Sequence, residues 1–485
     1  MKSKIIISLS VCLLVLTGGC KKILEVTPEA EFAPANVLTS EAGVKALLFS
    51  AYQNYQEQPN MRDVINLAEV TTDMAFNSGG NENLYLTQFI NFAWDPSISQ
   101  FQGVNWGPSY RIIRDANLVL ESIATVESTD AFKKQIGAEA RFLRALAYVT
   151  LYNWYGPVPL RISSKQEPEL ARASDDEMKT FIESELNAVV DGLPDPGKEE
   201  AFGRATKGAA LGLLTKFMLN TKQWQKASDA AKRVMDLNYY QLFPVFKDLF
   251  KVENEGNKEM IFVMPCINQT DQGNWMSAGA MPTAFLSTTQ LPEYRWNAGI
   301  QNFATMYRLR DELVNTFAAN DARFVTVLRT YTNTSNATIN LRATVDNARS
   351  LKFFDNAAVK NDHGNDFPII RYADILLSRA EALNEASGPS VEALSYLNPV
   401  RVRAGIPVLT LADVPSQDAF RDAILRERGW EFITEGKRRE DLIRQGKFIS
   451  KARARGVNAR DEQVLFPIPQ AEIDANKLIV QNKGY

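Results

Sequence analysis

The amino-acid sequence predicts a mostly α-helical protein, built from helix pairs that stack into a superhelix and carry long irregular loop excursions with little β-structure. Three observations lead to this prediction. Apolar residues recur every three or four positions over most of the chain, which is the spacing of one helix face. Two tandem helix pairs are recognisable. Two long stretches, residues 71–109 and 239–370, lack clear periodicity and are rich in Asn, Gly, Thr, Pro and aromatic residues.

The first half of the chain contains four predicted helices with clear end signals. Ser40 is a typical N-cap residue before the first helix. Ser174 to Glu177 reads as a capping box that predicts another helix start. Gly156-Pro157 predicts the end of a long helix. The apolar positions behind these signals include Val44, Leu48, Tyr55, Ile112, Ala116, Val119, Ile136, Leu143, Leu151, Met178, Ile182 and Leu186.

Two helices in tandem follow, at about residues 207–220 and 224–237. Small residues on the second helix let it lie close to the first, which resembles a tetratricopeptide unit of about 34 residues. A second such pair is predicted at residues 375–386 and 391–404, and a long helix at about 418–434. Any all-α bundle is the alternative interpretation. The stretches between these helices are too long for simple connections, which predicts functional loops with small irregular structure.

The N-terminus predicts a lipoprotein-type signal peptide over residues 1–19. Lysines precede an apolar run of residues 5–17, which is too short to span a bilayer because a spanning helix needs roughly 20 apolar residues. Small residues then precede Cys20, so we expect this cysteine to become the lipid-modified mature N-terminus. The usual lipobox has Leu three positions before the cysteine, whereas Thr17 stands there. A plain signal peptide with an incidental cysteine is the alternative.

Composition excludes several classes of function. Removal of residues 1–19 leaves 52 basic against 57 acidic residues, a net charge of −5, which argues against a nucleic-acid partner. Loss of Cys12 and lipidation of Cys20 leave Cys266 alone, so we expect no intrachain disulfide, and stability has to come from a large core.

Catalytic and metal-binding motifs are scarce. His363 is the only histidine, which excludes Ser-His-Asp and Cys-His catalysis and zinc sites built on several histidines. The oxygen-rich segment 361–366 could bind calcium, but it lacks EF-hand spacing. A solvated loop is the alternative, so we expect no cofactor, with calcium a possibility.

Carboxylates are too numerous to exclude a glycosidase, which needs only two of them. Glu427 and Glu431 lie four apart and therefore share one helix face. We interpret them as part of a structural ion-pair network with arginines nearby in the sequence, namely Arg401, Arg403, Arg426 and Arg428. The basic run from Lys437 to Arg455 is interleaved with acids, and we interpret it as a solvated face rather than a nucleic-acid patch.

The two excursions offer a different signal, because aromatic residues stand there beside amides, carboxylates and an arginine. Sugars present C–H faces that pack on aromatic rings and hydroxyls that need polar partners, and loops on a rigid scaffold often bind ligands. Anchoring of the loops to the core is the alternative role for any one of these aromatics. The candidate ligand-binding residues are Asp73, Asn77, Asn81, Tyr85, Trp94, Trp275, Tyr294, Arg295 and Trp296.

Several stretches, in order along the chain, together resemble the SusD/RagB family of Bacteroidetes outer-membrane lipoproteins. Cys20 to Pro28 looks like the mature start of that family, and residues 139–159 are similar to its best-known helix and helix exit. The later blocks that resemble the family are 371–384, 397–405, 424–431, 435–442, 465–469 and 481–485.

This resemblance implies a single domain over residues 20–485, with an N-terminal helical part (20–238), the loop-rich excursion (239–370) and a C-terminal helical part (371–485). It also implies a lipid-anchored protein on the outer face of the outer membrane. Such a protein captures oligosaccharides and delivers them to a SusC-like TonB-dependent transporter, without catalysis. A peptide-binding lid of the RagB type, a surface glycoside hydrolase and a protein-binding helical adaptor are the alternatives.

Overall fold

A computed structural model describes residues 38–56, 62–301 and 307–485. Within these ranges, sixteen α-helices form the bulk of the ordered elements, and nine short strands form four separate sheets of two or three strands. The prediction of a mostly helical fold with little β-structure is confirmed. None of the helices in these ranges is both long enough and apolar enough to cross a membrane. The predicted signal peptide and Cys20 lie outside the described residues.

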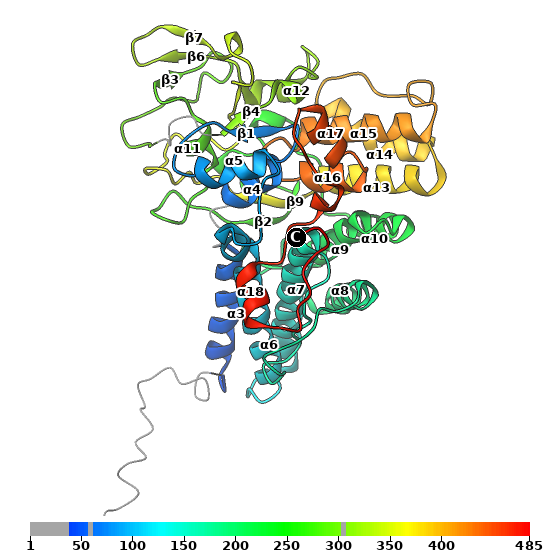
Figure 1. Ribbon diagram of the computed structural model, residues 1–485. Helices are drawn as coiled ribbons and strands as arrows, with labels where there is room; N and C mark the ends of the chain where they lie inside the picture. The colour runs from blue at the N-terminus through cyan, green and yellow to red at the C-terminus, as the bar shows by residue number, and fades with distance from the viewer. Residues whose placement is uncertain (1–37, 57–61, 302–306) are drawn as a thin grey trace, which may run out of the picture.

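The scaffold is an array of helices in which each helix packs against the next (Figure 1). The expected tandem pairs are α9–α10 and α13–α14. Helix α10 also packs against α13, so the two pairs adjoin although the long excursion separates them in sequence. The scaffold helices are α3 (Glu41–Gln56), α6 (Gly107–Ser122), α7 (Asp130–Tyr155), α8 (Asp175–Val189), α9 (Lys207–Asn220), α10 (Trp224–Asp236), α13 (Tyr372–Ser387) and α14 (Val391–Arg403).

The predicted helix ends are formed by the residues expected. Ser40 Oγ accepts the Gly43 N–H at 3.1 Å, and the capping box at Ser174 has both of its hydrogen bonds. Such a cap contributes about 0.5–2 kcal/mol. Helix α7 ends at Tyr155, and Gly156 follows it with φ 72°, a conformation that favours glycine. Helix α15 ends at Glu431 instead of continuing to Thr434, whose own φ is 64°.

The excursion 239–370 is closed at its base by strands β2 (Met260–Met264) and β9 (Phe367–Arg371), which pair antiparallel. Strand β4 (Tyr307–Leu309) inside it pairs with β1 (Ala75–Asn77), so the two excursions meet in space. The other elements of the long excursion are α11 (Met276–Ala280), β3 (Phe285–Ser287), α12 (Asp311–Val314), β5 (Val327–Leu328), β6 (Thr330–Asn333), β7 (Thr338–Asn340) and β8 (Arg349–Ser350).

The first excursion also contains short helices that its weak periodicity did not predict. These are α5 (Asn83–Ile90) and a π-helix (Phe101–Trp106), and α4 (Arg62–Glu69) precedes them. After α14 the chain forms four further helices, which are α15 (Gln417–Glu431), α16 (Arg438–Arg444), α17 (Phe448–Ala454) and α18 (Gln470–Ala475). Helices α15, α16 and α17 lie at the level of the excursions, whereas α18 lies over the scaffold helices α3, α6 and α7 in the view of Figure 1.

A buried group of charges joins the excursion to the scaffold. Arg371, at the end of β9, donates to the carboxylates of Glu259, Glu431 and Glu435 over distances of 2.6–2.9 Å. Burial by itself would raise the pKa of Glu431, but the surrounding arginines hold it well below its usual range. We call the whole group the central ion-pair cluster. Its members are Arg323, Lys352, Arg371, Arg401, Arg403, Asp321, Glu259, Glu427, Glu431 and Glu435.

The predicted ion-pair network around Glu427 and Glu431 is thus confirmed, with two changes of membership. Arg426 is exposed and lies over the Trp430 ring. Arg428 is fully buried but pairs with Asp374, at 2.8 Å, outside the cluster.

The interpretation of the basic run 437–455 as a solvated face is wrong for three of its residues. Arg438, Arg439 and Arg444 are each 4% exposed. Arg438 pairs with Asp73 and Arg444 with Glu381, both at 2.7 Å. These arginines therefore connect α16 to residues far away in the chain.

Candidate ligand-binding surface

Two of the predicted ligand aromatics lie in the core. Trp94 is 4% exposed and donates its indole N–H to Tyr485 Oη at 2.8 Å, and phenylalanine rings surround it. Tyr294 is also 4% exposed and stacks on Phe354 with ring centroids 5.0 Å apart. The faces of both rings are covered by protein, so we leave these two residues out of the ligand-binding surface.

Two of the predicted polar residues are buried as well. Asp73 is 2% exposed and pairs with Arg438 at 2.7 Å and with Lys451 at 2.9 Å. Burial would raise the pKa of Asp73, but these two cations outweigh it and hold the pKa well below its usual range. Asn77 is 3% exposed, and its Oδ1 accepts the Gly79 N–H at 3.1 Å. Both side chains organise the local chain.

Trp275 is half-buried at the start of α11, and the loop 355–363 holds it in place. Its indole N–H donates to Asp362 Oδ1 at 2.8 Å, and the Gly273 N–H donates to the same oxygen at 3.0 Å. A Cβ on Gly273 would lie 2.4 Å from Asp362 Cα, so this close approach of two loops requires glycine. The close approach of Gly273 to Asp362 and the indole hydrogen bond to Asp362 therefore fix the position of the Trp275 ring.

The loop 355–363 also positions Arg295 and Trp296. Arg295 is exposed, and its backbone N–H donates to Asn356 Oδ1 at 2.9 Å. Trp296 is half-buried at the edge of a small hydrophobic cluster, with its ring centroid 6.5 Å from that of Phe354. Trp275 and Trp296 thus lie on two segments that both contact the loop 355–363. We call this region the excursion surface, made of Trp275, Arg295, Trp296, Asn297 and Asn356.

The remaining two candidates, Asn81 and Tyr85, belong to the first excursion. Asn81 is exposed and Tyr85 is half-buried, and both lie at the start of α5 beside β1. Strand β1 pairs with β4, and α11 packs against β4, so these residues are connected to the helix of Trp275 through the two strands (Figure 1). Their role in binding stays a prediction.

The segment 361–366 is mostly buried, so its interpretation as a solvated loop is wrong. His363 is fully buried, and its Nδ1 accepts the Asp355 N–H at 3.0 Å. Burial lowers the pKa of His363 to about 4, so the ring is neutral. Asp362 and Asp366 accept backbone N–H groups from the facing loop. No group of three His, Cys, Asp or Glu residues in the described ranges could hold a metal ion, and calcium binding stays a prediction.

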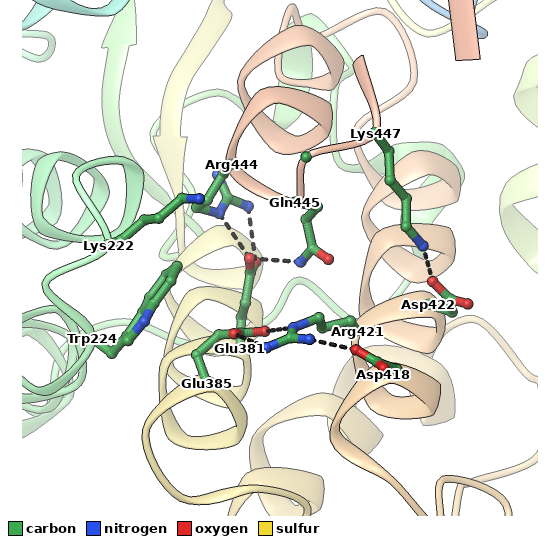
Figure 2. A pocket seen from close by; sticks show the side chains of 11 residues that line it. Lys222, Trp224, Glu381, Glu385, Asp418, Arg421, Asp422, Arg444, Gln445 and Lys447 are labelled. Atoms are coloured by element: carbon green, nitrogen blue, oxygen red, sulfur yellow. Dashed lines mark hydrogen bonds and ion pairs between the residues drawn. The ribbon is translucent and has the colours of Figure 1, made fainter. Parts of the chain in front are cut away.

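A polar cavity of about 450 Å³ lies between α10, α13, α15 and the end of α16 (Figure 2). Trp224 lines it at the start of α10, and Glu381 with Glu385 lines it from α13. From the sequence, Trp224 is predicted only as the first residue of the helix at about residues 224–237. The sequence signal for this cavity is Trp224 at the first position of one predicted helix, together with two carboxylates four residues apart, Glu381 and Glu385, on another.

A larger hollow of about 610 Å³ lies between the π-helix and α18. Its tryptophan, Trp106, is only 2% exposed. Arg161, which also lines it, already donates to backbone carbonyls. Gln102 and Tyr110 of the same lining also have partners, in Glu472 and in the Pro159 carbonyl, so several polar groups of this hollow are already hydrogen-bonded within the protein.

The stacked helix pairs, with loop surfaces built on them, define a tetratricopeptide-like helical-repeat protein. Comparison with known proteins gives the family. Residues 22–219 match a family model described as starch-binding and associating with the outer membrane, and residues 245–485 match the model of the SusD family. The chain belongs to the SusD family.

Individual relatives are similar over almost their whole length. The SusD-like protein P25 from Formosa agariphila is 26% identical over 532 residues, which cover 96% of this chain and 97% of that protein. The starch-binding protein SusD from Bacteroides thetaiotaomicron is 24% identical over 503 residues, covering 89% and 87%. A solved laminarin-binding SusD-like protein has a TM-score of 0.78 at 25% identity, covering 92% of this chain and all of that one.

Proposed function

We propose that this protein binds oligosaccharides at the outer face of the outer membrane and delivers them to a SusC-like TonB-dependent transporter. The observation that carries the proposal is the excursion surface. There two half-buried tryptophans, an exposed arginine and exposed asparagines lie together on loops that the loop 355–363 holds in place. The names of the relatives, which include starch-binding and laminarin-binding proteins, support the choice of ligand class.

The chemistry of this surface suits sugars. A partly exposed indole offers a ring face for sugar C–H groups at a low cost in side-chain entropy, since tryptophan has only two rotatable side-chain bonds. Exposed Arg295, Asn297 and Asn356 add donors and acceptors for hydroxyl groups. Because backbone hydrogen bonds hold these residues in place, little additional ordering is needed when a ligand binds.

Binding without turnover is the form of the proposal. The carboxylates of the central ion-pair cluster are buried against arginines and do not face solvent. On the excursion surface, Asp362 is 1% exposed and is held by two N–H donors. Neither arrangement supplies the two accessible carboxylates that glycoside hydrolysis needs.

The first test is native affinity electrophoresis of residues 21–485 in gels that contain laminarin, starch or other polysaccharides. The same mixtures are sampled over time for new reducing ends. We expect retardation in at least one gel and no product. Product formation would establish a hydrolase instead, and retardation by oligopeptide mixtures alone would favour a peptide-binding lid.

Variants then locate the site. Trp296→Ala removes a half-buried ring, Arg295→Ala removes an exposed guanidinium group, and Trp275→Phe keeps a ring while removing the N–H to Asp362. We expect weaker retardation for all three. The matched controls are Phe49→Ala on α3 and Arg233→Ala on α10, both exposed and on the helical scaffold. Equal loss in the controls would contradict the assignment of the surface.

Lipid anchoring is tested separately in cells. Cys20→Ser removes the thioether-forming sulfur, so we expect loss of fatty-acid labelling and release from the outer membrane. Thr17→Leu, which restores the usual lipobox residue, is the control and should leave labelling intact. Co-purification of the wild type with a TonB-dependent transporter tests the partner.

A further inference from the structure

We propose that the cavity between α10, α13, α15 and α16 is a second saccharide site, separate from the excursion surface, which takes a short neutral sugar with Trp224 as its platform. The proposal goes beyond the function above, because that function needs only the excursion surface. In Figure 1 the helices of this cavity lie on the opposite side of the molecule from α11 and β3.

The cavity has the size and rigidity of a ligand site. Its volume of about 450 Å³ lies in the lower part of the range of roughly 300–1,000 Å³ typical of small-molecule sites. Most of its side chains come from helices rather than loops, so their positions are fixed by the scaffold. Figure 2 shows the Trp224 ring on one side and the side chains of α15 on the other.

The charges of the cavity are balanced and mostly paired. Arg444 holds Glu381 at 2.7 and 2.8 Å, and Arg421 Nη2 donates to Glu385 Oε2 at 2.7 Å. Lys447 pairs with Asp422, and Arg421 also with Asp418. Among the four cations of the lining, only Lys222 has no ion pair within the described ranges.

This balance bears on the class of ligand. A charged ligand would have to displace an existing ion pair or rely on one exposed lysine. A neutral polyhydroxyl ligand needs no net charge, because paired carboxylates and guanidinium groups keep spare lone pairs and N–H donors. The walls are too polar for an apolar ligand, whose burial would desolvate these groups without replacing their hydrogen bonds.

Two further polar groups are left for a ligand to use. Gln445 donates its Nε2 to Glu381 Oε1 at 2.7 Å, but its own Oε1 is buried without a hydrogen-bond partner. The indole N–H of Trp224 also has no acceptor within the described ranges. An unmatched buried acceptor is costly, and because this oxygen is itself shielded, a ligand hydroxyl gains the hydrogen bond only when the Gln445 side chain turns toward the cavity. The Trp224 ring is partly buried against the hydrophobic core, and Figure 2 shows it across Glu381 from Gln445, so a ligand would meet the ring and the amide as separate contacts.

The test is titration calorimetry of residues 21–485 with glucose, galactose, mannose, maltose, cellobiose and laminaribiose, supported by tryptophan fluorescence. We expect at least one of these sugars to bind. Trp224→Ala should weaken its binding tenfold or more, while Trp224→Phe, which keeps a ring, should weaken it less. The control is Lys226→Ala on the exposed side of the same helix, which should not change the affinity.

The excursion-surface variant Trp296→Ala separates the two sites. If it leaves short-sugar binding unchanged while Trp224→Ala leaves polysaccharide retardation unchanged, the second site is supported. If no sugar binds, or if Trp296→Ala abolishes short-sugar binding, the second site is refuted while the proposed function can still stand. Trp224-dependent binding of glycylglycine or inorganic phosphate in place of a sugar would overturn the ligand class. Circular dichroism of Trp224→Phe checks that a loss of binding does not reflect unfolding.

Discussion

Replacing Arg371 by methionine tests how the excursion is held on the scaffold. Arg371 is 1% exposed and makes four hydrogen bonds to three carboxylates and one to the Glu431 carbonyl. Methionine keeps much of the volume but removes the charge. The central ion-pair cluster holds five cations and five carboxylates, so the variant retains one uncompensated buried negative charge.

The expected loss in the free energy of unfolding depends on which cations remain beside each carboxylate when Arg371 is removed. Charged hydrogen bonds are worth about 1.5–3 kcal/mol each, so a simple count of four would exceed about 6 kcal/mol. That count is too high, because Glu259 and Glu431 keep Arg403 and Glu435 keeps Lys352. Removing one partner from a buried ion pair costs about 3–5 kcal/mol, and we expect this loss in the free energy of unfolding.

Urea unfolding, followed by circular dichroism and tryptophan fluorescence, measures this loss. We expect a lower midpoint of the transition and an unchanged slope m of the free energy against urea concentration. Arg371→Lys keeps the charge and should lose less. Arg371→Met with Glu259→Gln restores the charge balance while Lys352 keeps Glu435 and Arg403 keeps Glu431, and it should recover at least about 1 kcal/mol of the loss. Arg426→Met, on the exposed side of α15, should change stability by no more than about 0.5 kcal/mol. The reasoning fails if the double variant is no more stable than Arg371→Met alone.

Two further predictions concern the loop 355–363, which holds the excursion surface in place. Burial lowers the pKa of His363 from 6.5 to about 4, so the unfolded chain takes up a proton first and stability falls as pH drops from 6.5 towards 4. Between pH 7 and 5 the wild type should therefore lose about 2 kcal/mol more than His363→Gln in parallel urea titrations, and equal losses would contradict the buried neutral ring. Gly273→Ala would place a Cβ 2.4 Å from Asp362 Cα, so we expect it to lower the free energy of unfolding by about 1–3 kcal/mol and to weaken polysaccharide retardation. The control Gly137→Ala, within helix α7, should be neutral or stabilising. Retardation of Gly273→Ala equal to that of the wild type would refute the role of this contact.

The helices were predictable because their signals are local. The pair at residues 207–237 needs only apolar spacing and Thr206, whose side chain caps α9 by accepting the Ala209 N–H. Ser174 and Glu177 likewise form their box within four residues. Such features depend little on distant parts of the chain, so the sequence states them directly.

The ligand-binding surface was predictable only in part, because burial is decided by partners far away in the sequence. Trp94 and Trp296 both stand in irregular segments beside polar residues. Trp94 is covered because Tyr485 reaches it from the other end of the chain, and no such partner covers Trp296 completely. The misreading of Arg438 has the same origin, since its partner Asp73 lies 365 positions away.

The burial of the central ion-pair cluster also determines how the protein responds to salt. Mobile ions weaken the attraction between charges only where solvent can reach them. The side chains of this cluster are at most 10% exposed, whereas Lys447 and Asp422 form a pair open to solvent. Ionic strength should therefore weaken the surface pair and leave the cluster unchanged. The charges that hold the loops in place are thereby insulated from the medium, and we expect the loops to keep the same geometry in seawater as in dilute buffer.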